Sequence, residues 1–179
     1  MILIGIDPGL TGAMAVITER GQIVSVYDTP VLAMGGKGGN RHVYDLPAML
    51  SILRLYCSPG MEAHAAIEKL HGIPIKSRRK PDDQSDIPGM GSTTSFAMGL
   101  GYGVWLMGLV AAGIKYTEVP PPTWRKAMLY GLPKGKDTGR LRAQQLFPGA
   151  DLKFKKHHGR ADALLLAEYL RRSLVNSAA

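Results

Sequence analysis

The feature that most restricts the fold of this chain is an apolar segment that ends in a carboxylate, and it occurs twice. Residues 2–6 (ILIGI) are followed by Asp7 and a Pro-Gly turn, and residues 63–67 (AHAAI) are followed by Glu68. A carboxylate at the end of a buried strand is costly to desolvate unless hydrogen bonds or a cation compensate it. If the two strands are neighbours in one sheet, Asp7 and Glu68 lie at the same edge, where one cation could serve both.

Apolar periodicity and turn residues predict an α/β chain. We expect strands over residues 2–6, 12–17, 22–27, 63–67 and 116–119, with the first three as an antiparallel meander. We expect helices over residues 45–56, 93–114, 123–130, 137–147 and 160–174. The glycine-rich residues 34–40 and a segment of about residues 71–92 are predicted to be flexible loops. Crossover helices make the later strands parallel to the first, so we expect a five-stranded mixed sheet flanked by helices, in a single domain over residues 1–179.

A third carboxylate stands near the C-terminus, in the segment KKHHGRADALLLAEYL. Asp162 begins the last predicted helix, and His158, four residues earlier, shares its face in helical geometry. Asp7, Glu68, His158 and Asp162 could therefore converge on one point. Carboxylate ligands with open positions suit Mg²⁺ or Mn²⁺, and two such ions can activate water for phosphodiester hydrolysis.

Asp7 and Glu68 also have purely structural interpretations. The Asp7 side chain could cap the following turn through the amides of Gly9 or Leu10. Glu68 could pair with Lys69 or with a surface arginine. In either arrangement the carboxylate would have a partner other than a metal ion.

The residues near the C-terminus have alternatives of the same kind. Asp162 could be a helix N-terminal charge favoured by the helix dipole. His158 could contact DNA or be merely exposed. His157 could take its place, although its five-residue offset from Asp162 fits a shared helix face less well.

The formal net charge of +8 is concentrated in one part of the chain. Residues 120–160 contain ten Lys or Arg and two Asp, which accounts for the whole excess. A concentrated basic surface points to a polyanion, most often nucleic acid, with a solvated surface as the alternative.

The apolar residues 93–114 invite comparison with a membrane span, because no charge falls between Asp86 and Lys115. Their polar beginning and their glycines favour a buried helix, so we expect no membrane association. The single cysteine, Cys57, and the short apolar start interrupted by Asp7 predict a reducing, cytoplasmic setting.

Taken together, several stretches resemble the RuvC-type Holliday junction resolvases, which have a ribonuclease H-like fold. The matching stretches are IGIDPGLTGAMAV, AAIEKL, MGSTTSFAMGLGYGVWLMGLVAAGI, VPPPTWRKAMLYG and HHGRADALLLAEYL. They occur in family order, cover most of the chain and are most similar to the bacteriophage and organellar branch. The resemblance implies a homodimeric, structure-specific DNA endonuclease that resolves four-way junctions by paired symmetric nicks, using two divalent ions. It also implies a bacterial or phage-infected cell as the setting, rather than an organelle.

The resemblance further implies roles for single residues. Asp7, Glu68 and Asp162 match acidic metal ligands of the family, and His158 stands at a position that is usually aspartate. Histidine is a good ligand for Mn²⁺ and suits Mg²⁺ less well. The residues implied in DNA binding are Lys76, Arg78, Arg79, Lys80, Arg125, Lys126, Lys134, Lys136 and Arg140. Among them, Lys136 is the candidate for stabilising negative charge at the scissile phosphate, with a solvated lysine as the alternative.

Other functions remain open at the level of the sequence. A structural protein that binds junctions or branched DNA and cuts weakly or not at all would follow if His158 weakens the metal site. A nucleotide-binding ATPase of the actin and sugar-kinase kind also begins with a turn like DPGLTG, but it needs two such domains. A ribonuclease H acting on RNA–DNA hybrids would share the acids but not the other matching stretches.

Overall fold

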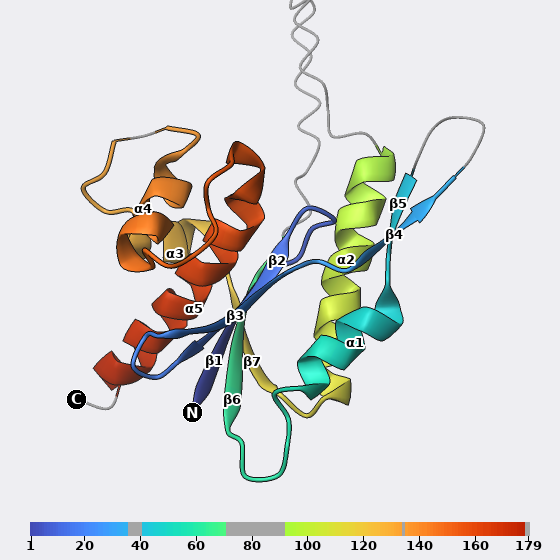
Figure 1. The fold of residues 1–179 in the computed structure, drawn as a ribbon, viewed down its shortest axis with the longest axis horizontal. Helices are drawn as coiled ribbons and strands as arrows, with labels where there is room; N and C mark the ends of the chain where they lie inside the picture. The colour runs from blue at the N-terminus through green and yellow to red at the C-terminus, as the bar shows by residue number, and fades with distance from the viewer. Residues whose placement is uncertain (36–40, 71–91, 134, 178–179) are drawn as a thin grey trace, which may run out of the picture.

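The computed structural model describes residues 1–35, 41–70, 92–133 and 135–177, and a five-stranded sheet lies at its centre (Figure 1). The strand order is β3-β2-β1-β6-β7. These strands are β1 (Ile2–Asp7), β2 (Ala13–Thr18), β3 (Ile23–Asp28), β6 (Ala63–Glu68) and β7 (Lys115–Val119). β1, β2 and β3 pair antiparallel, whereas β6 runs parallel to β1 and to β7. The predicted five-stranded mixed sheet, with its antiparallel meander, is confirmed.

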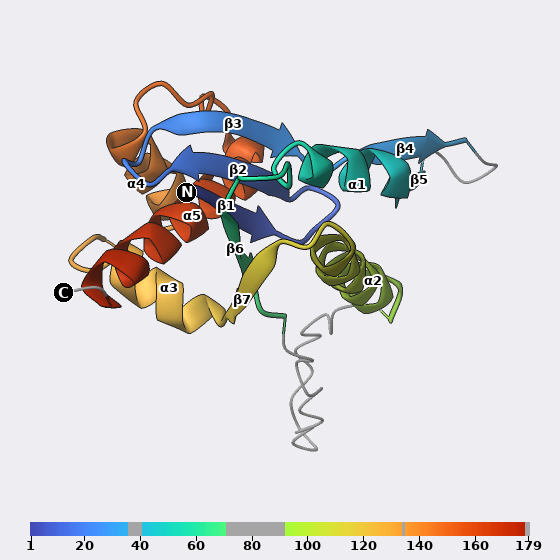
Figure 2. The ribbon, with the colours of Figure 1, turned by 90° about the horizontal axis from the view of Figure 1, so that it is seen from below.

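Helices cover both faces of this sheet (Figures 1 and 2). One face carries the long C-terminal helix α5 (His158–Ser177), with α3 (Pro121–Met128) and α4 (Thr138–Leu146) beside it. The other face carries α1 (Leu46–Arg54) and α2 (Ser92–Ala111). Each face has its own hydrophobic core, so the inner strand β1 is buried on both sides. This explains why its sequence is a continuous apolar run and not an alternating one.

Two glycines let α5 lie unusually close to the sheet and to the turn after β1. A Cβ on Gly5 of β1 would lie 2.0 Å from the carbonyl oxygen of Ala163 in α5. A Cβ on Gly159, in the first turn of α5, would lie 2.4 Å from the carbonyl oxygen of Thr11. These contacts press the beginning of α5 against the end of β1, where Asp7 lies.

The structure corrects the prediction of a loop that begins at residue 34. Met34 ends a strand, β4 (Val31–Met34), which forms a separate hairpin with β5 (Arg41–Tyr44). The Tyr44 hydroxyl donates a hydrogen bond to the carbonyl of Ala97 in α2, at 3.1 Å, and so attaches the base of the hairpin to that helix. Both strands are short and largely exposed, so neither shows the alternation by which a strand is detected. Residues 36–40 lie outside the described residues.

The boundaries of other elements also differ from the predictions. The last helix begins at His158, so Asp162 lies in its second turn and does not start it. α2 begins at Ser92 and ends at Ala111, before Gly113 with its left-handed φ of 67°. The rest of the predicted loop of about residues 71–92, residues 71–91, lies outside the described residues. No helix within the described part of the chain is sufficiently long and apolar to cross a membrane.

Candidate active site

Three carboxylates from distant parts of the sequence meet at one edge of the sheet. Asp7 and Glu68 end β1 and β6, which pair in parallel with Ile6 opposite Ile67. The expectation that the two acids share an edge is therefore confirmed. Asp162 joins them because the first turns of α5 pack against the same end of β1. We call Asp7, Glu68 and Asp162 the acidic centre.

Burial and mutual repulsion make ionisation of the carboxylates in the acidic centre unfavourable. The pKa of Asp7 is raised from 3.8 to about 7, first by burial and then by the charges of Asp162 and Glu68. The pKa of Asp162 is raised from 3.8 to about 6, mainly by burial, with Glu68 adding to the shift. Arg125 lowers the pKa of both groups but does not cancel the other effects. Such under-compensated carboxylates favour the binding of a cation.

Consecutive residues of α3 hold the Glu68 carboxylate. The indole Nε1–H of Trp124 donates a hydrogen bond of 2.8 Å to Oε2 of Glu68, and Trp124 itself is fully buried. Arg125 Nη2 lies 3.6 Å from the same oxygen and 3.4 Å from Oδ2 of Asp162. The alternative in which Glu68 pairs with a surface arginine thus occurs in this structure. For Asp7, the Gly9 amide donates to the main-chain oxygen of Asp7, at 3.0 Å.

The two neighbouring histidines have different environments. His157 is buried, with its ring edge-on to Phe154 at 5.3 Å between centroids. His158 is exposed at the start of α5, and its charge lowers the pKa of Asp162, so it lies near that carboxylate. Of the two, His158 is the exposed one and the one whose charge acts on Asp162.

Arg160 fixes the beginning of the helix that carries Asp162. Its Nε and Nη2 donate to the two carboxylate oxygens of Asp28, at the end of β3, at 2.6 and 2.7 Å. Its Nη1 donates to Oδ2 of Asp151 at 3.0 Å. A guanidinium in such a two-pronged contact defines orientation as well as distance. The Asp28–Arg160 contact therefore ties the first turn of α5 to the sheet.

The basic residues predicted to bind DNA fall into three groups. Arg125 lies at the acidic centre, and Lys126 and Lys136 are exposed. Arg140 donates to the carbonyl of Leu152 at 3.0 Å and is largely buried, so its guanidinium is used within the protein. The remaining candidates, Lys76, Arg78, Arg79, Lys80 and Lys134, lie outside the described residues.

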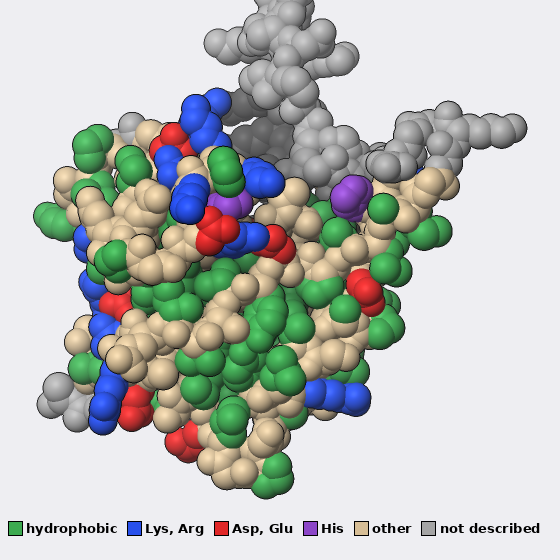
Figure 3. Space-filling model, in the orientation of Figure 1, with side chains coloured by type: hydrophobic (Ala, Val, Ile, Leu, Met, Phe, Trp, Pro, Cys, Tyr) green, Lys and Arg blue, Asp and Glu red, His purple; other side chains and the backbone are tan. Residues whose placement is uncertain are grey.

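The surface distribution of charge agrees with the sequence count. On the face shown in Figure 3, most of the visible Lys and Arg side chains lie over the half of the molecule that contains α3, α4 and α5. Lys136 precedes α4, whose first turn adjoins the acidic centre: a Cβ on Gly139 would lie 3.3 Å from Oδ1 of Asp162. The basic surface and the acidic centre therefore lie on the same side of the sheet.

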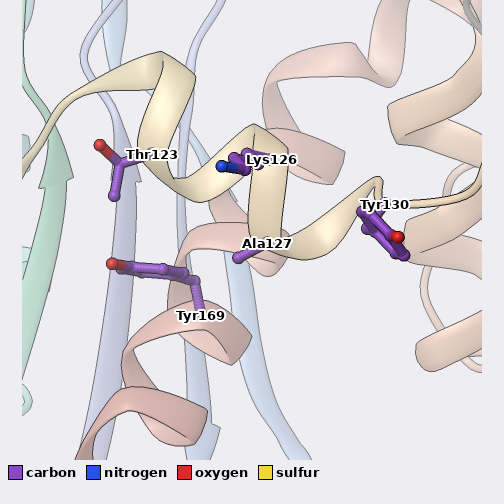
Figure 4. Close-up of a pocket in the computed structure, with 5 residues that line it drawn as sticks. All are labelled: Thr123, Lys126, Ala127, Tyr130 and Tyr169. Carbon is purple, nitrogen blue, oxygen red and sulfur yellow. The ribbon is translucent and has the colours of Figure 1, made fainter.

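An open pocket of about 470 Å³ lies between α3 and α5 (Figure 4). Its lining residues are Thr123, Lys126, Ala127, Tyr130 and Tyr169. Tyr130 is 86% exposed, and Tyr169 stands two helical turns beyond Asp162 on α5. The pocket thus presents two tyrosine side chains and one lysine.

The acidic centre has the donors, but not yet the arrangement, of a metal site. Carboxylate oxygens are the ligands that Mg²⁺ and Mn²⁺ prefer. Within the described residues, no three His, Cys, Asp or Glu side chains are placed so that they could hold an ion. The guanidinium of Arg125 lies between two of the three carboxylates instead.

Comparison with known structures identifies the architecture. The chain superposes on Thermus thermophilus RuvC in complex with a Holliday junction substrate with a TM-score of 0.57, at 15% sequence identity, over 99% of this chain and 97% of that chain. A second Thermus thermophilus RuvC structure gives a TM-score of 0.53 at 16% identity, over 98% of this chain and 97% of that one. The fold is that of RuvC. The predicted ribonuclease H-like fold is thereby confirmed.

Sequence comparison gives a partial match of the same kind. No family model matches the chain. The chloroplastic Holliday junction resolvase MOC1 of Chlamydomonas reinhardtii is 40% identical over 86 residues. That match covers 46% of this chain and 10% of the longer protein, so the chain spans about a tenth of its relative. The motifs predicted a resemblance to RuvC-type junction resolvases. The fold shows it over nearly the whole chain, and the sequence shows similarity to a junction resolvase over 46% of the chain.

Sequence reasoning missed three features of the site. It did not find Trp124 as the partner of Glu68, or Arg125 as the partner of two carboxylates. It also did not find the pocket between Tyr130 and Tyr169. The segment PPPTWRKAMLYG shows a short helix with basic residues, but its sequence does not show which side faces the sheet edge.

Proposed function

We propose that this chain is a metal-dependent, structure-specific DNA endonuclease that resolves four-way junctions by paired symmetric nicks. The observation that carries the proposal is the meeting of Asp7, Glu68 and Asp162 at the end of β1, with pKa values of about 7 for Asp7 and about 6 for Asp162. The RuvC fold and the partial match to a Holliday junction resolvase support this choice among metal-dependent hydrolases. The proposal treats residues 1–179 as one nuclease domain.

The acidic centre and His158 would hold the divalent ions, two for each site. Bound ions of this kind activate water and stabilise the leaving oxygen in phosphodiester hydrolysis. Trp124 orients Glu68 through its indole N–H. The Asp28–Arg160 contact holds the first turn of α5, and this helix carries both His158 and Asp162. These contacts keep the carboxylates in place without filling all of their lone pairs.

The basic surface beside the acidic centre would bind the phosphates of the junction. Lys126 is exposed on α3, and Lys136 is exposed on the segment that precedes α4. Lys136 is our candidate for a charge close to the scissile phosphate, because α4 begins beside Asp162. The pocket between Tyr130 and Tyr169 adds aromatic surface on which an unstacked base can lie.

A homodimer would place two such sites on the two symmetric strands of a junction. One face of α2 supports this assembly, because it is apolar, uncharged and exposed. Its members are Phe96 (72% exposed), Leu100 (48%), Met107 (63%) and Val110 (56%). They recur at helical spacing, and Gly103 between them has open space where a Cβ would be, so a second helix can approach closely.

The dimer is tested by a charge placed on this face. Leu100→Glu should convert a dimer into a monomer in sedimentation-velocity experiments, since it buries an unpaired carboxylate in the interface. Leu141→Glu is the matched control, because Leu141 is 51% exposed on a different helix and should leave the dimer intact. A wild-type chain that is monomeric at all concentrations would contradict the proposed assembly.

The nuclease activity is tested with a labelled four-way DNA junction and a linear duplex of the same sequence. We expect nicks in the junction alone, in Mg²⁺ or Mn²⁺ but not with a chelator, and none from Asp7→Asn. Glu19→Gln is the matched control, because Glu19 is 62% exposed and pairs with the N-terminal amine away from the site. Junction binding without nicks in either metal would instead favour a structural protein that binds branched DNA.

A further inference from the structure

One guanidinium nitrogen links two of the three carboxylates of the acidic centre. Nη2 of Arg125 lies 3.6 Å from Oε2 of Glu68 and 3.4 Å from Oδ2 of Asp162. Glu68 belongs to β6 and Asp162 to α5, so this nitrogen connects two separate elements. The guanidinium therefore supplies a positive charge between these two carboxylates.

The local structure holds the Arg125 side chain there without burying it. The guanidinium carbon lies 5.1 Å from the centre of the Trp124 ring, a distance at which a cation is attracted to the ring face. The Trp124 ring is itself fixed, because it is fully buried and donates its N–H to Glu68. The Arg125 side chain is nevertheless 50% exposed, so it can leave the carboxylates without disrupting the core.

The charge of Arg125 is permanent, and it acts on the whole acidic centre. A guanidinium stays protonated at every pH at which a protein is folded. Its charge lowers the pKa of both Asp7 and Asp162, against the opposing effect of burial. The Arg125 charge therefore already compensates part of the negative charge that would attract a divalent ion.

We propose that Arg125 is a resident cation of the acidic centre, which a divalent ion must displace before it binds Glu68 and Asp162 together. This inference rests on the metal site of the proposed function. It adds that the Arg125 guanidinium competes with a divalent ion for Glu68 and Asp162. It accounts for the guanidinium that lies within 3.6 Å of one carboxylate and 3.4 Å of another. Once displaced, the half-exposed Arg125 is free to contact a DNA phosphate beside the ion.

The direct test is the affinity of the metal-free protein for Mn²⁺, measured by the loss of the free Mn²⁺ signal in electron paramagnetic resonance. Arg125→Ala should bind Mn²⁺ about tenfold more tightly than the wild type, because the competing charge is gone. Lys126→Ala is the matched control: it removes a neighbouring positive charge that lies in the pocket and not between the carboxylates. Its affinity should stay within about twofold of the wild type.

The outcomes separate this inference from the proposed function. If the wild type and Arg125→Ala bind Mn²⁺ equally well, the proposed metal site is supported, but the proposed competition by Arg125 is overturned. An equal gain in Arg125→Ala and Lys126→Ala also overturns it, because the effect would then be one of overall charge. If no variant binds Mn²⁺, the metal site itself is refuted, and the competitor with it.

A second measurement follows the displacement itself. The Nε–H signal of Arg125 in a ¹⁵N–¹H correlation spectrum is identified by its loss in Arg125→Lys. Titration with Mg²⁺ should shift this signal, with the same midpoint as that of the metal-binding curve. A signal that stays fixed while Mg²⁺ binds would overturn the proposal.

Discussion

Replacing Asp7 by asparagine should stabilise the metal-free protein, although it should abolish the proposed activity. Asp7 is a carboxyl group whose pKa is raised from 3.8 to about 7 by burial and by the charges of Asp162 and Glu68. Each pKa unit corresponds to about 1.4 kcal/mol, so the ionised form costs the folded state about 4 kcal/mol at most. Asparagine removes the charge but leaves a polar group to be accommodated, so we expect Asp7→Asn to recover about 2 kcal/mol.

The gain should depend on pH in a defined direction. The folded state holds the Asp7 proton up to about pH 7, whereas the unfolded chain releases it near pH 3.8, so the wild type loses stability as pH rises between these values. The advantage of Asp7→Asn should therefore be largest above pH 7 and should disappear below about pH 4. For a chain of this size, about 2 kcal/mol corresponds to a rise in Tm of about 4–8 °C.

The assay is thermal unfolding in the presence of a chelator at several pH values between 4 and 8. Asp28→Asn is the control, and it should change the stability in the opposite direction. The Asp28 carboxylate accepts two hydrogen bonds from Arg160, which lower its pKa. Its loss should destabilise the protein by about 1 kcal/mol or less, since the pair is partly exposed. If Asp7→Asn is no more stable than the wild type at pH 8, the interpretation of Asp7 as an under-compensated buried charge is refuted.

Two further substitutions test how the site is built. Gly5→Ala should lower Tm strongly, because the added Cβ would clash with the Ala163 carbonyl and push away α5. Because α5 carries Asp162, the same substitution should weaken Mn²⁺ binding. Unchanged Mn²⁺ affinity would show that the close packing of α5 does not position Asp162. Trp124→Phe keeps the buried ring but leaves Glu68 without its 2.8 Å hydrogen bond, so unfolding in urea should show a loss of about 1–3 kcal/mol. A fully stable Trp124→Phe would mean that solvent or Arg125 replaces the indole.

The sequence predicted those features that leave a pattern in neighbouring residues, and it missed those that do not. The ends of β1 and β6 were predicted because each is a short apolar run that stops at a carboxylate, and both Asp7 and Glu68 are found there. The hairpin of β4 and β5 was missed because its strands are short and exposed, and the glycines between them signal a loop. Local patterns report burial and turns, and they fail where a segment has neither a buried face nor a regular period.

By itself, the sequence determined the α/β class, the carboxylates at strand ends, the spacing of His158 from Asp162 and the concentration of positive charge in residues 120–160. The tertiary structure alone decided that β1 pairs with β6 and that α5 lies close enough to bring Asp162 to Asp7. It alone placed Trp124 and Arg125 against Glu68. The physical reason is that hydrophobic periodicity fixes which side of an element is buried, whereas partner and distance depend on how all the elements pack together.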